Sequence, residues 1–182
     1  MQTLYIHPDN PQDRLTRQVA QSLTSDKLIM LPTDLGYVFA ITLSAKNAQK
    51  TTQQLCSDEC HWVLVCRDLS QIATYANMDD GQFRTIKAHH GTPAIFVLPA
   101  TKATPKQLTH PKHKTIGTLI ATTPISLALL DTLGEPFAIC CPADTIHEPY
   151  MADERFGHQL DILVDIGTLD NPDIPLINLS AE

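Results

Sequence analysis

The order of apolar and polar positions along the chain predicts helices and strands that alternate. Leu15, Val19 and Leu23 recur every four residues after Asn10-Pro11, a typical helix start, which predicts a helix with one buried stripe. Short apolar runs bounded by turn residues predict strands in the same way. Strands are expected at 27–31, 37–43, 62–66, 94–98, 115–121, 137–141, 161–165 and 176–179, and helices at 11–23, 45–55, 69–76, 82–89 and 124–133. This interleaving, without a break in composition, predicts one α/β domain over residues 1–182 with a twisted, open, mixed β-sheet.

Composition is consistent with that domain and limits where the protein works. The chain has 182 residues, of which 43% are hydrophobic and 18% charged, as in ordinary globular proteins. No apolar run approaches the roughly 20 residues that span a bilayer, and the first residues do not form a secretory signal. The 5 cysteines form an odd set without a regular framework. We therefore expect a cytoplasmic protein with no membrane partner.

Charge is distributed unevenly, although the formal net charge is −7. Between Asp80 and Asp131 there is no acidic residue, whereas this segment contains six basic residues and four histidines. Such a basic segment can bind phosphate groups, although a solvated basic face explains it equally well. The candidates for RNA or phosphate binding are Lys102, Lys106, Lys112 and Lys114. The accompanying histidines, including His110 and His113, are expected to be surface residues that are mostly neutral at pH 7.

Several stretches of the chain match motifs of one known family. They are IHPDNPQDRL (6–15), LPTDLGY (31–37), CRDLS (66–70), TIG (115–117), PISLALLDTLGEP (124–136) and DILVDIG (161–167). The sequence thus resembles the YrdC/YciO family, and its YciO branch in particular. The resemblance implies a YrdC-like domain whose sheet and flanking helices surround a concave pocket. Active members make threonylcarbamoyl-AMP from threonine, bicarbonate and ATP with Mg²⁺, a step in tRNA modification, and members are also described as binding double-stranded RNA.

Most residues that carry this chemistry in active members are replaced. By the resemblance, Thr52 and Gln54 occupy the positions of a lysine and an arginine that grip phosphates, and Leu119 occupies that of another arginine. Cys141 and Ala143 occupy the positions of a Ser-x-Asn motif. Losing two or three charge-assisted contacts at about 1.5–3 kcal/mol each lowers affinity by roughly 2 to 6 orders of magnitude. ATP binding in the family's manner is therefore not expected.

Other positions of the family's pocket are kept. Thr33, Asp34 and Tyr37 remain, as does Thr115 in the TIG motif, while Leu35 replaces an expected threonine or serine. The full set of pocket candidates is Thr33, Asp34, Tyr37, Thr52, Gln54, Thr115, Leu119, Cys141 and Ala143. No catalytic residue is predicted. Asp34 and Tyr37 could equally serve a turn and a strand end.

The cysteines form a weak candidate for metal or disulfide chemistry. Cys56, Cys60 and His61 provide donor atoms, but their spacing is loose, and the only other pair is Cys140-Cys141. If the fold follows the family, both groups lie near the vacated nucleotide site. The alternative is a set of idle thiols, because cysteine is among the most commonly buried residues.

The sequence leaves three hypotheses for function. The first is a YciO-like protein linked to tRNA threonylcarbamoyladenosine modification that has lost the synthase activity and keeps RNA, tRNA or a nucleotide-like molecule as its partner. The second is an active L-threonylcarbamoyladenylate synthase that uses ATP and Mg²⁺ and takes a pocket-facing cation from the segment 102–114. The third is an acidic protein-interaction domain. No cofactor is predicted under the first or the third.

Overall fold

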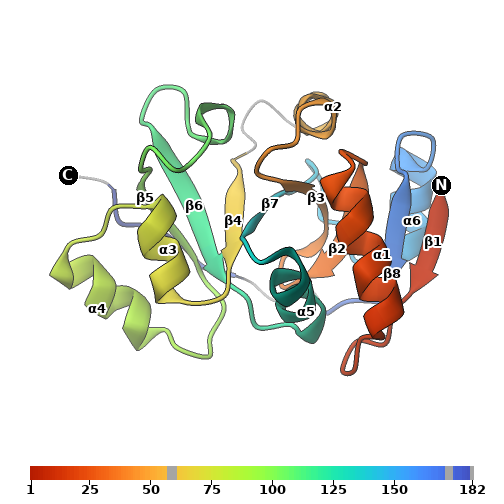
Figure 1. The fold of residues 1–182 in the computed structure, drawn as a ribbon, viewed down its shortest axis with the longest axis horizontal. Helices are drawn as coiled ribbons and strands as arrows, with labels where there is room; N and C mark the ends of the chain where they lie inside the picture. The colour runs from red at the N-terminus through yellow and green to blue at the C-terminus, as the bar shows by residue number, and fades with distance from the viewer. Residues whose placement is uncertain (57–60, 171–173, 181–182) are drawn as a thin grey trace.

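The computed structural model describes residues 1–56, 61–170 and 174–180 (Figure 1). In these residues nine strands form one sheet, in the order β1-β8-β2-β3-β7-β4-β6-β5-β9. The strands are β1 (Gln2–Tyr5), β2 (Ile29–Thr33), β3 (Gly36–Thr42), β4 (Val63–Cys66), β5 (Ile95–Pro99), β6 (Thr115–Ile120), β7 (Phe137–Cys140), β8 (Ile162–Asp165) and β9 (Leu176–Asn178). The helices are α1 (Asp13–Thr24), α2 (Asn47–Leu55), α3 (Leu69–Tyr75), α4 (Asp80–Ala88), α5 (Pro124–Leu133) and α6 (Pro149–Phe156), with a 3₁₀ turn, η1 (Lys106–Leu108).

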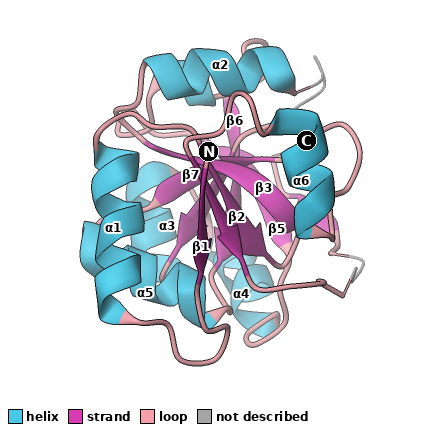
Figure 2. Cartoon of the chain, turned by 90° about the vertical axis from the view of Figure 1, so that its right-hand side faces the viewer, coloured by secondary structure: helices cyan, strands magenta, loops and turns pink. Residues whose placement is uncertain are grey.

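The sheet is mixed, as the sequence predicted. β1 and β2 both pair with β8 in parallel, β4 pairs with β6 in parallel, and β5 pairs with β9 in parallel. β3 lies antiparallel between β2 and β7, and β6 and β5 are also antiparallel. Viewed along the sheet, the strands fan out with a strong twist (Figure 2). The predicted fold, an open twisted mixed sheet with flanking helices, is confirmed.

The predicted start of the first helix is wrong by two residues. α1 begins at Asp13, with Gln12 rather than Asn10 at the N-cap position. The preceding segment forms a turn instead, in which Nδ1 of His7 accepts hydrogen bonds from the backbone N–H groups of Asp9 and Asn10. The side chain of Gln12 accepts the backbone N–H of His7 and closes the turn. Asn10 therefore lies in this turn and does not cap the helix.

Alternation along the strands produces two cores, one on each face of the sheet. Val63 and Val65 of β4 belong, with Ile95, to the core on the first face, which also contains residues of α1 and α5. Leu64 and Cys66 point to the second face. Figure 2 shows α1 and α5 on one side of the sheet and α6 on the other. Among the described residues, no helix combines the length and apolar character that a bilayer-spanning segment needs.

A loop that contains the η1 turn connects β5 to β6 at the end of the sheet formed by β4, β6, β5 and β9. We call residues 100–114 the β5–β6 loop. It is held in place by backbone hydrogen bonds from His110 to Thr115 and from Lys114 to His110, each 2.8 Å long. The hydroxyl of Thr104 also donates to the carbonyl of Tyr75 at 2.7 Å. The loop thus forms a fixed wall above the strands, at the upper left of Figure 1.

A candidate binding pocket under the β5–β6 loop

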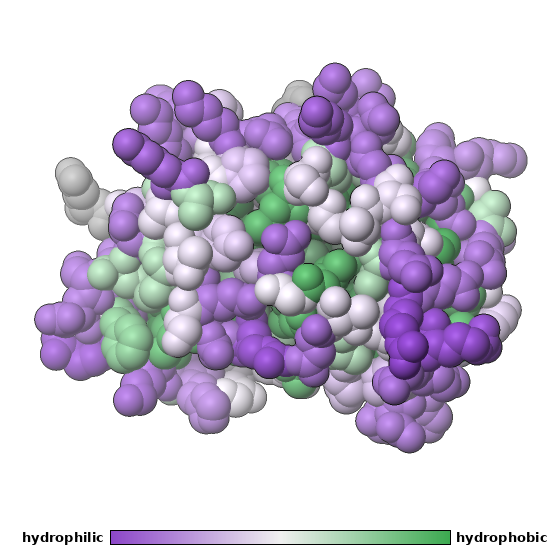
Figure 3. Space-filling view, viewed as in Figure 1, coloured by the Kyte–Doolittle hydropathy of each residue, from purple (hydrophilic) through white to green (hydrophobic). Residues whose placement is uncertain are grey.

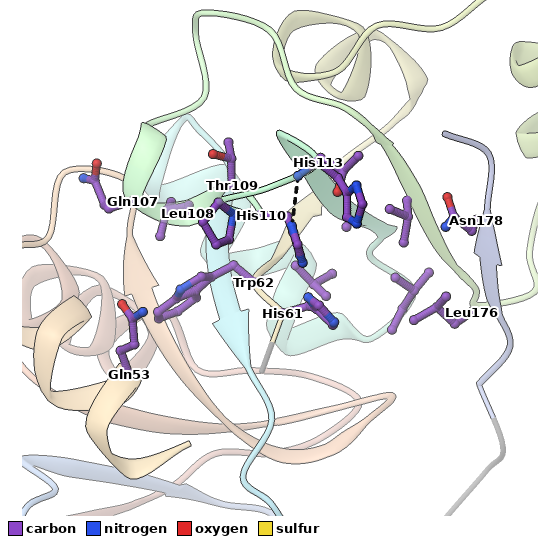
Figure 4. A pocket seen from close by; sticks show the side chains of 16 residues that line it. Gln53, His61, Trp62, Gln107, Leu108, Thr109, His110, His113, Leu176 and Asn178 are labelled. Carbon is purple, nitrogen blue, oxygen red and sulfur yellow. Dashed lines mark hydrogen bonds between the residues drawn. The ribbon is translucent and has the colours of Figure 1, made fainter. Parts of the chain in front are cut away.

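The space between this loop and the strands is a pocket of about 460 Å³. Its walls come from α2, the segment before β4, strands β4, β5, β6 and β9, and the loop (Figure 4). The lining residues are Gln53, His61, Trp62, Val63, Ile95, Val97, Gln107, Leu108, Thr109, His110, Pro111, His113, Thr115, Gly117, Leu176 and Asn178. None of these described residues carries a full charge at neutral pH, apart from any protonated histidine. The pocket therefore suits an uncharged ligand better than a polyphosphate.

Gly117 and Trp62 shape the floor of the pocket. A Cβ atom at Gly117 would lie 3.0 Å from Cγ2 of Val63 and 3.2 Å from the carbonyl oxygen of Trp62, so only glycine leaves the floor undisturbed. The Trp62 side chain is buried in the adjoining core but reaches the pocket. Because Trp62 is the chain's single tryptophan, tryptophan fluorescence reports on its surroundings, which include this pocket.

Three histidine rings follow one another along the wall (Figure 4). The ring centroids of His61 and His110 are 5.5 Å apart and their planes differ by 28°. Those of His110 and His113 are 4.6 Å apart, with planes that differ by 29°. The three rings therefore form an offset stack that joins the segment before β4 to the β5–β6 loop. We call this group the histidine stack.

The loop backbone fixes the hydrogen-bonding state of the middle ring. Nδ1 of His110 accepts the backbone N–H groups of Lys112, at 3.2 Å, and His113, at 3.1 Å. An accepting Nδ1 carries no proton, so the neutral ring bears its proton on Nε2. Burial lowers the pKa of His110 from its ordinary value of 6.5, and His113, His61 and Lys112 lower it further. At neutral pH the centre of the stack is thus an uncharged ring.

Amide side chains complete the polar part of the lining. Oε1 of Gln53 accepts a hydrogen bond of 2.7 Å from Nε2 of Gln49, which leaves the Gln53 amide nitrogen as a donor. In Figure 4 this nitrogen points towards Trp62. Gln107 and Asn178 contribute amides from the loop and from β9. These groups can donate and accept hydrogen bonds without a net charge.

The predicted lysines border the pocket but do not line it. Lys106, Lys112 and Lys114 are exposed and are immediate sequence neighbours of lining residues, while the exposed Lys102 lies further back in the loop. Hydrophilic side chains project around this loop at the upper left of Figure 3, and apolar side chains show at the centre of the same face. A basic rim thus lies beside an uncharged pocket.

The predicted pocket residues do not all come together. Thr115 lines the pocket. Thr33 is buried at the end of β2, where its hydroxyl donates to the carbonyl of Gly36 and accepts the N–H of Leu35 in the turn that follows. Asp34 accepts a hydrogen bond of 2.7 Å from Thr122. Both side chains are thus engaged in connecting loops.

Tyr37 packs on the opposite face of the sheet from Thr115. Its side chain belongs to the second core, and its hydroxyl donates to the carbonyl of Gly167 at 2.7 Å and accepts the N–H of Ile166 at 3.1 Å. Burial, followed by the carboxylates of Asp165 and Glu148, raises the pKa of Tyr37 to about 12. This hydroxyl therefore joins β3 to the segment after β8 and stays protonated.

The positions that would hold cations in active relatives face different surroundings. The Thr52 side chain is fully buried, Gln54 is exposed, and it is Gln53 between them that lines the pocket. Leu119 is buried in the first core, where it pairs with Ile95 across the sheet. These side chains fill the core or face solvent.

The cysteine candidates are only partly described. Cys60 lies outside the described residues, and Ala143 is exposed. Cys56 is buried, and burial, with a smaller effect of Cys141, raises its pKa to about 12. Cys140 ends β7, beside Phe39 of β3. Within the described ranges, no three His, Cys, Asp or Glu residues are arranged to hold a metal ion.

The sequence did not identify the histidine stack as part of a site. His110 and His113 were expected to be surface residues, and His61 was considered only as a metal ligand. The available signal was the position of histidines beside lysines in a segment without acids. That pattern could not show that the segment folds back over β6 and meets His61.

The fold is an open mixed α/β sheet, and it carries a candidate ligand-binding pocket at one end. A family profile described as "Telomere recombination", for Sua5, YciO and YrdC proteins, matches residues 21–174. The chain therefore belongs to the Sua5/YciO/YrdC family. It is 34% identical to the uncharacterized protein YciO of Escherichia coli K12, over all of this chain and 91% of that protein. An uncharacterized protein of Haemophilus influenzae has the same identity and coverage.

Solved structures agree with this assignment. The crystal structure of E. coli YciO matches all of this chain and 91% of that one, with a TM-score of 0.92. P. abyssi Sua5, solved with L-threonine, matches 98% of this chain and 54% of its own, with a TM-score of 0.85 and 17% identity. The first comparison confirms the predicted YciO-like domain, and the second shows a shared fold.

Proposed function

We propose that this chain is a binding protein for RNA or a nucleotide-like ligand and that it does not make threonylcarbamoyl-AMP. The observation that carries this proposal is the uncharged lining of the described pocket. A triphosphate beside a carboxylate substrate needs fixed cations, because each buried negative charge must be paired. Amides, imidazoles and an indole instead suit the uncharged part of a nucleotide.

The replaced residues support the same conclusion. Thr52 is buried and Leu119 lies in a packed core, so neither position can present a cation to a ligand. Gln54 is exposed but has only a neutral amide. The link to tRNA modification rests on the family alone.

An active synthase would need a cation from elsewhere in the chain. The lysines of the β5–β6 loop are the obvious source, but they alternate with lining residues and do not themselves line the pocket. Direct measurement of activity therefore decides between this alternative and the proposal.

The decisive measurement is threonine-dependent release of pyrophosphate from ATP with bicarbonate and Mg²⁺, with an active family member assayed in parallel. We expect no release above the enzyme-free rate. Turnover comparable with the active relative would refute the proposal.

A second measurement tests the mode of binding. Titrations of adenosine, AMP and ATP with Mg²⁺, followed by Trp62 fluorescence, should give at most a modest gain in affinity from adenosine to AMP and no further gain from AMP to ATP. A large gain from AMP to ATP would show that the site binds the phosphate chain after all.

A further inference from the structure

We propose that the pocket binds one unpaired base of a single-stranded RNA, while neighbouring phosphates lie on the lysines of the β5–β6 loop. This inference rests on the proposed function and specifies its ligand. Three features of the described residues carry it, namely the histidine stack, the uncharged polar lining and the basic rim.

The histidine stack provides a surface for a flat ring. His110 has a ring on either side, whereas His61 and His113 are exposed and each has only one ring partner among the described residues. A base can therefore extend the stack at either end. Single-stranded RNA is commonly recognised by stacking of bases on aromatic side chains, including histidine.

The lining offers hydrogen bonds to the edge of a base. The free amide nitrogen of Gln53 is a donor, and Gln107 and Asn178 can each donate and accept. The pocket volume of about 460 Å³ lies within the usual range of about 300–1,000 Å³ for small-molecule sites. A base satisfies these groups without bringing a charge into the pocket.

The lysines supply the complementary contacts to the backbone. Lys112 and Lys114 flank His113, and Lys106 precedes Gln107, so charged and ring-bearing positions alternate along the loop. The three lysines are exposed, and no ion pair is recorded for them in the described part of the chain. A strand whose base enters the pocket would place its adjacent phosphates over this rim.

A pocket that holds one base favours single-stranded RNA over a duplex. A base in a duplex is stacked and paired, so it reaches a pocket only after unpairing, which costs a few kcal/mol. A single strand presents its bases freely. The pocket should thus favour a single strand over a duplex, whereas the lysines alone would bind either.

The test uses the fluorescence of Trp62 together with the anisotropy of labelled RNA. The probes are octamers of uridine and of adenosine, a fully abasic octamer with the same backbone, which should bind weakly and leave the fluorescence unchanged, and a duplex of the same length. We expect the intact single strands to change Trp62 fluorescence on binding. The duplex should bind at least tenfold more weakly and leave the fluorescence unchanged.

Point variants locate the contact. The double variant His61→Ala/His113→Ala removes both ends of the stack and should weaken single-strand binding about 5- to 150-fold, since stacking contributes about 1–3 kcal/mol per base. His158→Ala changes an exposed histidine near the end of α6 and should bind as the unaltered protein does. Circular dichroism of each variant checks that the fold is kept.

Two results would overturn the inference. One is equal affinity for duplex and single strand with no change in Trp62 fluorescence, which would indicate backbone contacts alone. The other is unchanged binding by the His61/His113 variant. Neither affects the proposed absence of synthase activity, which pyrophosphate release tests separately.

Discussion

At the scale of single residues, a glycine holds the turn between β2 and β3 against the segment after β7. Gly36 has a φ of +96°, and a Cβ atom there would lie 2.7 Å from the carbonyl oxygen of Ile146. That carbonyl accepts the backbone N–H of Tyr37 at 2.8 Å. The turn and the opposing segment can meet at this distance only because residue 36 has no side chain.

Gly36→Ala should therefore destabilise the protein by more than the roughly 1–2 kcal/mol that a left-handed conformation costs a residue with a Cβ. The matched control is Gly91→Ala, whose φ is +81° but whose Cβ would meet nothing within 4 Å. Urea denaturation of both variants separates conformational cost from steric clash. Equal losses of unfolding free energy would show that the contact with Ile146 contributes nothing.

His110 should make stability depend on pH. Its folded pKa is lowered from 6.5, chiefly by burial and then by His113, His61 and Lys112. The unfolded chain binds a proton at this histidine more readily than the folded protein does, so protonation favours unfolding. The contribution of neutral His110 to stability is therefore complete above about pH 6.5 and is lost as the pH falls through the folded pKa. His110→Asn, whose side-chain oxygen can accept the same backbone N–H groups, should show a shallower fall in Tm between pH 7.5 and 5.

The double variant His61→Ala/His113→Ala tests whether the neighbouring rings contribute to the lowered pKa of His110. In His61→Ala/His113→Ala the neighbouring rings are gone but His110 remains, so the fall in Tm should be intermediate. If His110→Asn and the unaltered protein lose Tm in parallel, the His110 pKa is not lowered by folding.

At the scale of elements, α4 illustrates how a short helix is fixed by its first turn. Oδ1 of Asp79 accepts the backbone N–H of Gln82 at 2.7 Å, and Oε1 of Gln82 accepts the backbone N–H of Asp79 at 2.8 Å. This is a complete capping box. Nε2 of Gln82 also donates to the carbonyl of Leu179, which ties the helix to the segment after β9.

Asp79→Ala should cost about 0.5–2 kcal/mol of stability, because both the capping acceptor and its geometry are lost. Asp79→Asn keeps a capping oxygen and should retain most of that stability. Thermal unfolding monitored by circular dichroism measures the difference. The helix does not depend on its cap if both variants melt alike.

The elements also show which parts of the fold local sequence can predict. α5 was predicted correctly because its signals are local. The side chain of Thr123 caps the helix by accepting the backbone N–H of Ser126, Pro124 lies in the first turn, and Gly134 ends the helix with a φ of +74°. β1 and α6 were missed. β1 has only one fully buried residue, Leu4, and becomes a strand through pairing with β8, which is about 160 residues away along the chain.

The candidate site was harder to predict for the same reason. The family alignment pointed to Thr52, Leu119 and Tyr37, but helix rotation and strand alternation decide where side chains point, and these three lie in packed cores. The histidine stack depends on a loop that folds over β6 and brings His110 to His61. No local pattern carries that long-range information.

At the scale of the whole molecule, charge and shape place the predicted contact surface in one region. The net charge is −7, yet the segment between Asp80 and Asp131 has no acidic residue, and its lysine-rich part is the β5–β6 loop. An acidic protein repels nucleic acid over most of its surface, so the field around this loop should govern both the affinity and the orientation of binding.

The final prediction is that RNA binding is weak, sensitive to salt and centred on this loop. In a salt titration, the quadruple variant Lys102→Ala/Lys106→Ala/Lys112→Ala/Lys114→Ala should lose affinity and show a shallower slope of log affinity against log salt. Each single-strand phosphate contact contributes about 0.7 to that slope, so the loss is at most about 2.8.

The matched control removes four exposed basic residues outside the lining of the pocket, Arg14, Arg17, Lys27 and Lys46, and so changes the net charge equally. Its slope should stay close to that of the unaltered protein, because counterions are released only where phosphates are contacted. Equal affinity and slope in the loop variant and the unaltered protein would move the binding surface away from the β5–β6 loop. Equal losses in the loop and control variants would mean that overall charge governs binding, and not a surface at the rim of the pocket.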